Sequence, residues 1–397
     1  MTRACILSQI QNLLNVRICV DNNVMVRPAL SPTAASPPTY QWDIYCWVID
    51  NFGDAGVCLR LARDLVGLGH RVRLFINDAD ALDWLATDTD RARITVLPWS
   101  ETPWDHGHPP DVIVEAFGCD LPDTVVSAIA AAPQTTWVNL EYLSAEPYAA
   151  ACHGLASPVM SGPAKGHVKW FFYPGFTPDT GGLLGPEPDP LQDAAHPSPP
   201  AAWVAASPLP KVGVFSYESP GLETLVSAAR AGRIALFAAS GRSAAAIQQY
   251  AAVQPLAPPL VYLEPMSQPQ FDAFLAAMDI NVVRGEDSLV RALWTGKPFV
   301  WHIYPQDDGA HYAKLKAFLD WLSPPAEVRA LMTAWNQPTT SPAQIDGLWT
   351  RCQARTVYTE WEICVQGAVA RLSQQWPLAQ QLAHFVWSKK RLANTNG

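Results

Sequence analysis

Residues 280–288 read INVVRGEDS, and residues 289–294 continue with LVRALW. A short apolar run typical of a β-strand meets a glycine turn, and two acids and a serine then open a helix. The start of a helix presents free N–H groups and the positive end of the helix dipole, so it suits an anionic diphosphate. Arg284 adds a cationic side chain beside that start. The stretch therefore predicts a phosphate ligand with a carboxylate next to it.

A second junction of this kind lies near the beginning of the chain, where residues 43–56 read DIYCWVIDNFGDAG. Residues 43–49 are typical of a buried strand, and a helix is expected over residues 55–68. Asp50 ends the strand and Asp54 stands at the mouth of the helix, where open α/β sheets bind ligands. An acid at that turn would repel a pyrophosphate, so we expect this half to hold something other than a nucleotide. Two such junctions in separate halves predict a two-lobed enzyme with a cleft between the lobes.

Strands and helices alternate along both halves at a spacing typical of a parallel sheet with helices on both faces. Residues 160–210 interrupt the pattern with many prolines, and we interpret them as a linker or an irregular surface segment. After about residue 310 the chain is expected to be helical. The predicted fold class is α/β of the GT-B type, with two Rossmann-like lobes facing a cleft and C-terminal helices that cross back to the first lobe. The expected segments are a disordered N-terminal extension (1–40), an N-terminal Rossmann-like lobe (41–185), a proline-rich linker (186–210), a C-terminal Rossmann-like lobe (211–370) and a C-terminal helix that returns to the first lobe (371–397).

The composition narrows the classes of partner. The 397 residues are 49% apolar and 16% charged, as in globular domains, and carry a formal net charge of −9, which argues against generic nucleic-acid binding. No apolar run reaches the roughly 18–20 residues that a membrane span needs. The eight cysteines are scattered without a C-x-x-C pair, so the simplest interpretation is reduced thiols in a cytoplasmic protein. We therefore expect neither a nucleic-acid nor a membrane partner.

We also expect no cofactor and no metal ion. His302, His311 and the acids Asp307 and Asp308 superficially resemble metal ligands, but their spacing matches no known ligand pattern. We interpret them as structural or surface residues. No G-x-S-x-G elbow is present, so a serine nucleophile of that kind is not predicted either.

Each acidic candidate has a structural alternative. Asp54 is also placed to act as an N-cap, and Asp50 to close an Asx-turn. Glu286 and Asp287 suit the first turn of a helix simply because carboxylates stabilise its dipole. Ser288 is also a suitable N-cap.

The other candidates have alternatives too. Arg284 is placed to pair with Glu286 alone. Tyr217 follows the first strand of the second half, where it would stack on a base or a sugar, with core packing as the alternative. Gln268 stands at a helix start, and its alternative is an ordinary capping role.

At these same residues the chain resembles a known family. Its opening, DIYC at 43–46 and VIDNFGDAGVCLRLAR at 48–63, is similar to that of the bacterial protein-arginine rhamnosyltransferases that modify elongation factor P. RGEDS at 284–288 matches the donor-site run of that family. FFYPGF at 171–176 and WHIYPQ at 301–306 match further family segments.

The resemblance covers about residues 41–385. It implies an inverting transfer of L-rhamnose from dTDP-β-L-rhamnose to one arginine of translation elongation factor P, a modification that supports translation through polyproline stretches. The first lobe would bind the acceptor protein and the second lobe the donor. The chain departs from the family in its 40-residue leader, in the long proline-rich insert near 185–205 and at Phe52, where a tyrosine is expected.

The resemblance also implies residue roles. Carried over by motif, Asp50, Asp54 and Glu286 are the catalytic acids. In the resulting hypothesis Asp54 accepts a proton from the attacking guanidinium, Asp50 holds that guanidinium, and Glu286 orients it or steadies the oxocarbenium-like state. The expected donor-binding residues are Asn51, Phe52, Gly53, Tyr217, Gln268, Arg284, Gly285, Asp287 and Ser288. Two alternatives stay open: a GT-B enzyme with another nucleotide-sugar or acceptor, and a non-catalytic two-lobed protein-binding module.

Overall fold

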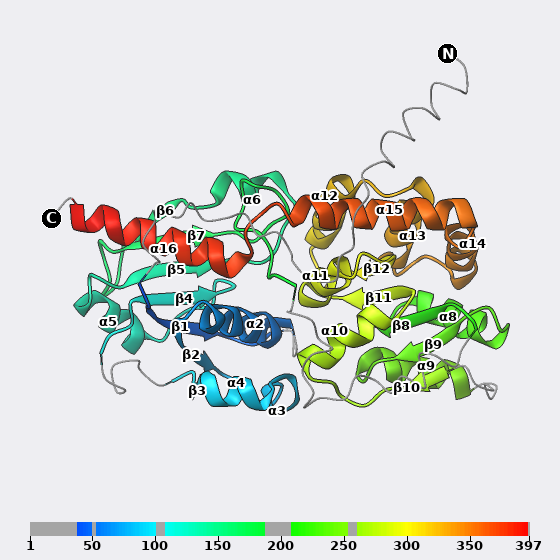
Figure 1. Cartoon of the computed structure of the whole chain (residues 1–397), viewed down its shortest axis with the longest axis horizontal. Helices are drawn as coiled ribbons and strands as arrows, with labels where there is room; N and C mark the ends of the chain where they lie inside the picture. The colour runs from blue at the N-terminus through cyan, green and yellow to red at the C-terminus, as the bar shows by residue number, and fades with distance from the viewer. Residues whose placement is uncertain (1–37, 50–52, 101–107, 187–207, 253–259, 396–397) are drawn as a thin grey trace, which may run out of the picture. The chain divides into compact units, whose positions relative to one another are not determined.

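Two separate β-sheets organise the part of the chain that the structure describes, each with helices packed against it (Figure 1). The computed structural model describes residues 38–49, 53–100, 108–186, 208–252 and 260–395. The expected extension therefore lies almost wholly outside the described residues, as does most of the expected linker.

The first sheet has the strand order β3-β2-β1-β4-β5-β7-β6. Its strands are β1 (Gln41–Cys46), β2 (Arg71–Ile76), β3 (Thr95–Pro98), β4 (Val112–Ala116), β5 (Thr136–Leu140), β6 (Ala156–Pro158) and β7 (Val168–Phe172). Its helices are α2 (Gly53–Gly67), α3 (Leu82–Leu85), α4 (Asp88–Arg93), α5 (Asp123–Ala131) and α6 (Pro147–Cys152). All neighbouring strands pair in parallel except β6, which runs antiparallel to β7.

The second sheet is parallel throughout and has the order β10-β9-β8-β11-β12. Its strands are β8 (Lys211–Phe215), β9 (Ala235–Ala238), β10 (Leu260–Tyr262), β11 (Ile280–Arg284) and β12 (Phe299–His302). The helices between them are α8 (Pro220–Arg230), α9 (Arg242–Ala252), α10 (Gln268–Ala277) and α11 (Asp287–Trp294).

The chain ends in five consecutive helices. They are α12 (Ala310–Leu322), α13 (Ala326–Trp335), α14 (Pro342–Cys352), α15 (Arg355–Leu372) and α16 (Leu378–Thr395). The apolar face of α15 belongs to the core of the second lobe, whereas Leu378, Leu382 and Val386 of α16 are buried in the core that β1, β2, β4 and β5 share with α2. Figure 1 shows α16, in red, on the first lobe. The last helix thus crosses back to the first lobe.

Both strand-to-helix junctions lie where their sheet reverses its order. In the first sheet the direction changes between β1 and β4, and α2 follows β1. In the second it changes between β8 and β11, and α11 follows β11. Connections leave such a point in opposite directions and open a crevice at the carboxyl ends of the strands. The topology therefore places both motifs where α/β sheets bind ligands.

The sequence reasons for α2 are plain. Leu61 and Leu65 lie fully buried on one face, as the apolar spacing predicts. The helix ends at Gly67, and Gly69 follows with φ of +90°, a conformation that glycine adopts without strain.

Three details of the fold differ from what the sequence predicts. Residues 160–210 were expected to be irregular, but they contain β7, which pairs with β5 inside the sheet. Only Phe172 of β7 is fully buried, so burial imposes no regular pattern on this strand. The antiparallel β6 likewise corrects the expectation of an all-parallel sheet. Tyr40, assigned to the extension, is 7% exposed and stacks on His70.

Candidate active site

Asp54 lies inside the first turn of α2, so it is not the N-cap of that helix. Asp54 is 4% exposed, and its Oδ2 accepts a hydrogen bond of 2.9 Å from the Ile49 amide. The Tyr142 hydroxyl, from the segment after β5, also donates to this carboxylate. Burial, followed by the charges of Asp54 and Glu286, raises the pKa of Tyr142 far above its ordinary value. Tyr142 therefore keeps its proton and acts as a hydrogen-bond donor to Asp54.

Glu286 comes from the second lobe and reaches the same place. It is the N-cap residue of α11, but its side chain makes no capping bond. Instead Oε2 accepts a hydrogen bond of 2.8 Å from the Leu143 amide of the first lobe, and Oε1 forms an ion pair with Lys314 of α12. The Lys314 ammonium also lies 5.7 Å from the centre of the Tyr142 ring. Acids from the two lobes thus converge on Tyr142.

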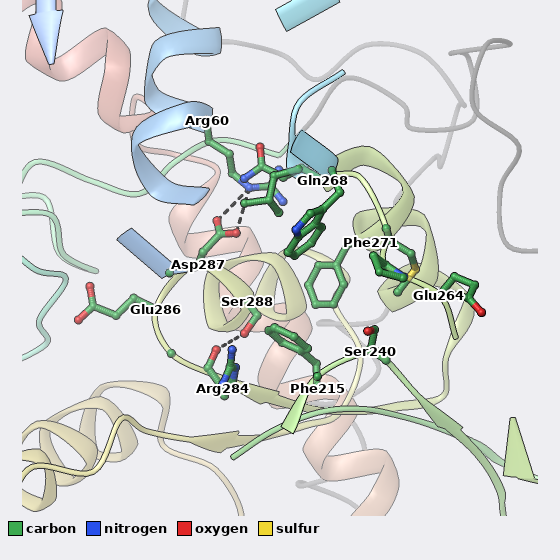
Figure 2. A pocket seen from close by; sticks show the side chains of 18 residues that line it. Arg60, Phe215, Ser240, Glu264, Gln268, Phe271, Arg284, Glu286, Asp287 and Ser288 are labelled. Atoms are coloured by element: carbon green, nitrogen blue, oxygen red, sulfur yellow. Dashed lines mark hydrogen bonds and ion pairs between the residues drawn. The ribbon is translucent and has the colours of Figure 1, made fainter. Parts of the chain in front are cut away.

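Arg284 ends β11 and is 6% exposed. Its guanidinium lies 4.7 Å from the ring centre of Phe215 and 4.6 Å from that of Tyr217. The Ser288 hydroxyl donates to the Arg284 carbonyl, four residues earlier, so Ser288 does not cap α11. These contacts hold a positive charge beside the start of α11, as Figure 2 shows.

A cavity of about 890 Å³, open space at its mouth included, lies beside this junction. Figure 2 shows Phe215 and Phe271 at one side of it and Glu286 pointing away from them. Its walls include the following expected site residues: Gly53, Gln268, Arg284, Gly285, Glu286, Asp287 and Ser288. The cavity therefore has an apolar side and a side with positive electrostatic potential, formed by Arg284 and the N-terminus of α11.

Tyr217 does not line this cavity. It is 3% exposed and packs edge-on against His302 and Tyr304, at 5.3 and 5.7 Å between ring centres. This is the core-packing alternative. Phe215, two residues earlier, takes the lining position.

Gln268 and Asp287 engage the first lobe. Gln268 is the first residue of α10, whose N-cap is Ser267, so Gln268 is not the cap. Its Nε2 donates 2.9 Å to the Gly56 carbonyl. The Asp287 carboxylate pairs with Arg60 of α2, with 2.9 Å between Nε and Oδ1.

Three of the expected site residues stay predictions. Asp50, Asn51 and Phe52 lie outside the described residues. His302 and His311 are buried: the Ser216 hydroxyl lies 2.9 Å from Nδ1 of His302, and Nδ1 of His311 accepts 3.0 Å from the Gln306 amide. Within the described ranges no three His, Cys, Asp or Glu side chains gather as a metal site would need. No helix in that part of the chain has the length and apolar character of a membrane span.

Sequence reasoning missed three residues of this region. Tyr142 and Lys314 contact the acids, and Arg60 joins the lobes. No spacing signal marks Tyr142 or Lys314. Arg60 is six residues after Asp54 on the same helix, but only the fold places its partners.

The architecture defines the class of protein. UGT89C1 of Arabidopsis thaliana in complex with quercetin, 11% identical, superposes with a TM-score of 0.57 over 89% of this chain and 100% of that chain. A structure that explains "EarP-mediated arginine glycosylation of translation elongation factor EF-P", 26% identical, superposes with a TM-score of 0.55 over 87% and 98%. The predicted GT-B fold is thus confirmed, and the chain has the fold of a glycosyltransferase.

The sequence comparisons identify the family. The family model described as "Elongation-Factor P (EF-P) rhamnosyltransferase EarP" matches residues 42–387. The protein-arginine rhamnosyltransferase of Pseudomonas putida is 36% identical, over 89% of this chain and 95% of that protein. That of Pseudomonas aeruginosa is 35% identical, over 87% and 98%. The chain belongs to the EF-P rhamnosyltransferase family and is an enzyme, which sets aside a non-catalytic module.

Proposed function

We propose that the enzyme transfers L-rhamnose from dTDP-β-L-rhamnose to an arginine of translation elongation factor P, with inversion at the anomeric carbon. The observation that carries this proposal is the convergence of Asp54 and Glu286, one from each lobe, on Tyr142 beside the cavity. The names of the relatives, protein-arginine rhamnosyltransferases, support the reaction. The solved relative that concerns EF-P supports the acceptor.

The donor fits the cavity by its chemistry. The diphosphate is anionic, and Arg284 with the free amides at the start of α11 supplies positive potential. The thymidine is flat and largely apolar, which suits the side lined by Phe215 and Phe271. This arrangement leaves the sugar at the end nearest Glu286.

The acceptor demands a base. A guanidinium has a pKa above about 12 and a delocalised lone pair, so it is a poor nucleophile. One of its nitrogens forms the new bond to the anomeric carbon while the bond from that carbon to the diphosphate oxygen breaks. The nitrogen loses a proton, which Asp54 accepts, and the electron pair of the broken bond leaves with dTDP. A single displacement of this kind inverts the anomeric centre.

Glu286 and Tyr142 complete the acceptor side. Glu286 is held by the Leu143 amide and so faces the site as a carboxylate that attracts the guanidinium. The hydroxyl of Tyr142 fixes the orientation of the Asp54 carboxylate. The Asp50 assignment remains part of the proposal, resting on the family motif alone.

The test is intact-mass analysis of elongation factor P after incubation with the enzyme and dTDP-β-L-rhamnose. We expect a mass increase of one deoxyhexosyl group, lost when the acceptor arginine is replaced by lysine. NMR of the product should give the inverted anomeric configuration. Transfer from dTDP-glucose or UDP-sugars at the same rate, or no transfer to elongation factor P, would overturn the proposal.

A further inference from the structure

Arg60 is a cation buried between the two lobes. It extends from α2, six residues beyond Asp54, and is 2% exposed. A buried charge is costly unless it is paired and hydrogen-bonded. The partners of Arg60 should therefore reveal why the fold keeps it.

Its partners include two carboxylates of the second lobe. Nη1 and Nη2 bind Oδ2 and Oδ1 of Asp272, on α10, at 2.9 and 3.0 Å. Nε lies 2.9 and 3.2 Å from the two oxygens of Asp287, on α11. All three guanidinium nitrogens thus face carboxylates, so Arg60 lines the cavity with its charge already neutralised.

Asp272 is shared with a second guanidinium. Arg291 of α11 binds Oδ1 through Nε and lies near Oδ2 through Nη2, both at 3.0 Å. Burial would raise the pKa of Asp272, but Arg291 and Arg60 together hold it below its ordinary value. We call Arg60, Asp272, Asp287 and Arg291 the interlobe network. It balances two positive and two negative charges.

The helices approach closely around this network. Gln268 donates to the Gly56 carbonyl at 2.9 Å, one turn before Arg60. A Cβ at Gly56 would lie 3.3 Å from Nε2 of Gln268 and 3.6 Å from Oδ2 of Asp287. A shift of α2 relative to α10 and α11 would therefore break hydrogen bonds of this contact.

The interlobe network connects the helix that carries Asp54 to the helix that follows Glu286. Asp54 is in the first turn of α2, and Asp287 is in the first turn of α11, next to Glu286. Six residues of helix separate Asp54 from Arg60, about 9 Å along the axis. We infer that Arg60 is a positioning residue, which clamps α2 against α10 and α11 and so fixes the distance from Asp54 to the anomeric carbon of the donor. This inference rests on the proposed function.

The variant that tests it is Arg60→Met, which keeps the aliphatic stem and removes the guanidinium. Arg73→Met is the matched control, because Arg73 also forms a buried two-bond pair, with Asp43, but inside the first sheet. Steady-state transfer to elongation factor P is measured well below the melting temperature of both variants. Because a misplacement of about 1 Å costs roughly 100-fold in rate, we expect kcat of Arg60→Met to fall about 10- to 100-fold and that of Arg73→Met to stay within about twofold.

Two further variants separate positioning from stability. Arg60→Met leaves the buried Asp272 carboxylate with one guanidinium fewer. The double variant Arg60→Met/Asp272→Asn removes that negative charge, so its melting temperature should recover while its kcat stays low. Arg60→Lys keeps one charged contact and should recover part of kcat. If the double variant regains kcat along with stability, or if Arg60→Met matches Arg73→Met in kcat, Arg60 is merely structural and the inference fails.

Hydrogen exchange provides a readout that needs no transfer. Arg60→Met should speed amide exchange in α10 and the first turn of α11, whereas Arg73→Met should not. Unchanged exchange in Arg60→Met would overturn the inference. If the wild-type enzyme transfers no rhamnose, the proposed function fails, and this exchange experiment still decides whether Arg60 clamps the lobes.

Discussion

At the scale of single residues, Asp54 carries the most specific prediction. Asp54→Asn keeps the shape of the side chain and an oxygen for the Ile49 amide. Because an amide cannot accept the guanidinium proton, we expect transfer to fall by about 10²- to 10⁴-fold. Calorimetry should give an unchanged affinity for dTDP, since the diphosphate side belongs to the other lobe. A variant that transfers normally would remove Asp54 as the base.

Lys314 offers a second residue-scale prediction, because its ammonium holds the place beside Glu286 that a guanidinium would take. Lys314→Met frees the Glu286 carboxylate. A partly exposed ion pair contributes about 0.2–1 kcal/mol, so the KM for elongation factor P should fall by up to about fivefold. Affinity for dTDP should not change.

The control for this prediction is Lys316→Met on the same helix. Lys316 is exposed and pairs with Asp320, away from Glu286, so its loss should leave the acceptor KM unaltered. An increase in the acceptor KM for Lys314→Met would mean that the lysine assists binding rather than competing with it.

At the scale of elements, the end of β12 contains a buried histidine with a pH consequence. Burial, with a smaller contribution from Arg284, lowers the pKa of His302 from 6.5 to about 4, against the opposing effect of Glu218. Between these two values the unfolded chain binds a proton that the folded chain does not. The free energy of unfolding should therefore decrease as pH falls from about 6.5 to 4, by up to about 3 kcal/mol.

Urea denaturation at several pH values measures this dependence. His302→Asn, which retains a hydrogen-bonding side chain near Ser216, should flatten the curve across this window. Replacement of the exposed His108 should leave it as steep as in the wild type. If His302→Asn keeps the full slope, another group is responsible.

The secondary-structure elements also show how much of the fold could be predicted from the sequence. The fully buried, valine-rich strands β4 and β11 and the amphipathic α2 were predictable because burial dictates their pattern. β7 was not, because it is only partly buried and its pairing with β5 is a tertiary event. The same limit applies to the site. Motifs marked Asp54 and Glu286, whereas Arg60 and Asp272 meet across 212 positions of sequence that no local pattern connects.

At the scale of the whole molecule, α16 makes the first lobe depend on the end of the chain. Leu382 is fully buried in the core that α16 shares with β1, β4 and α2. Leu382→Ala should lower the free energy of unfolding by about 2–5 kcal/mol, because a cavity remains where the side chain packed. That loss is a large fraction of the roughly 5–15 kcal/mol that stabilises a typical protein.

Leu392→Ala on the same helix is the matched comparison, since Leu392 is 59% exposed and should cost less than about 0.5 kcal/mol. Chemical denaturation gives both values. Because α15 and α16 are joined by only five residues, 373–377, unfolding of α16 frees the crossing that ties the second lobe to the first. We therefore expect Leu382→Ala to reduce transfer on warming at a temperature where dTDP binding, which we propose for the second lobe, persists. Simultaneous loss of both would instead mean that the two lobes unfold as one cooperative unit.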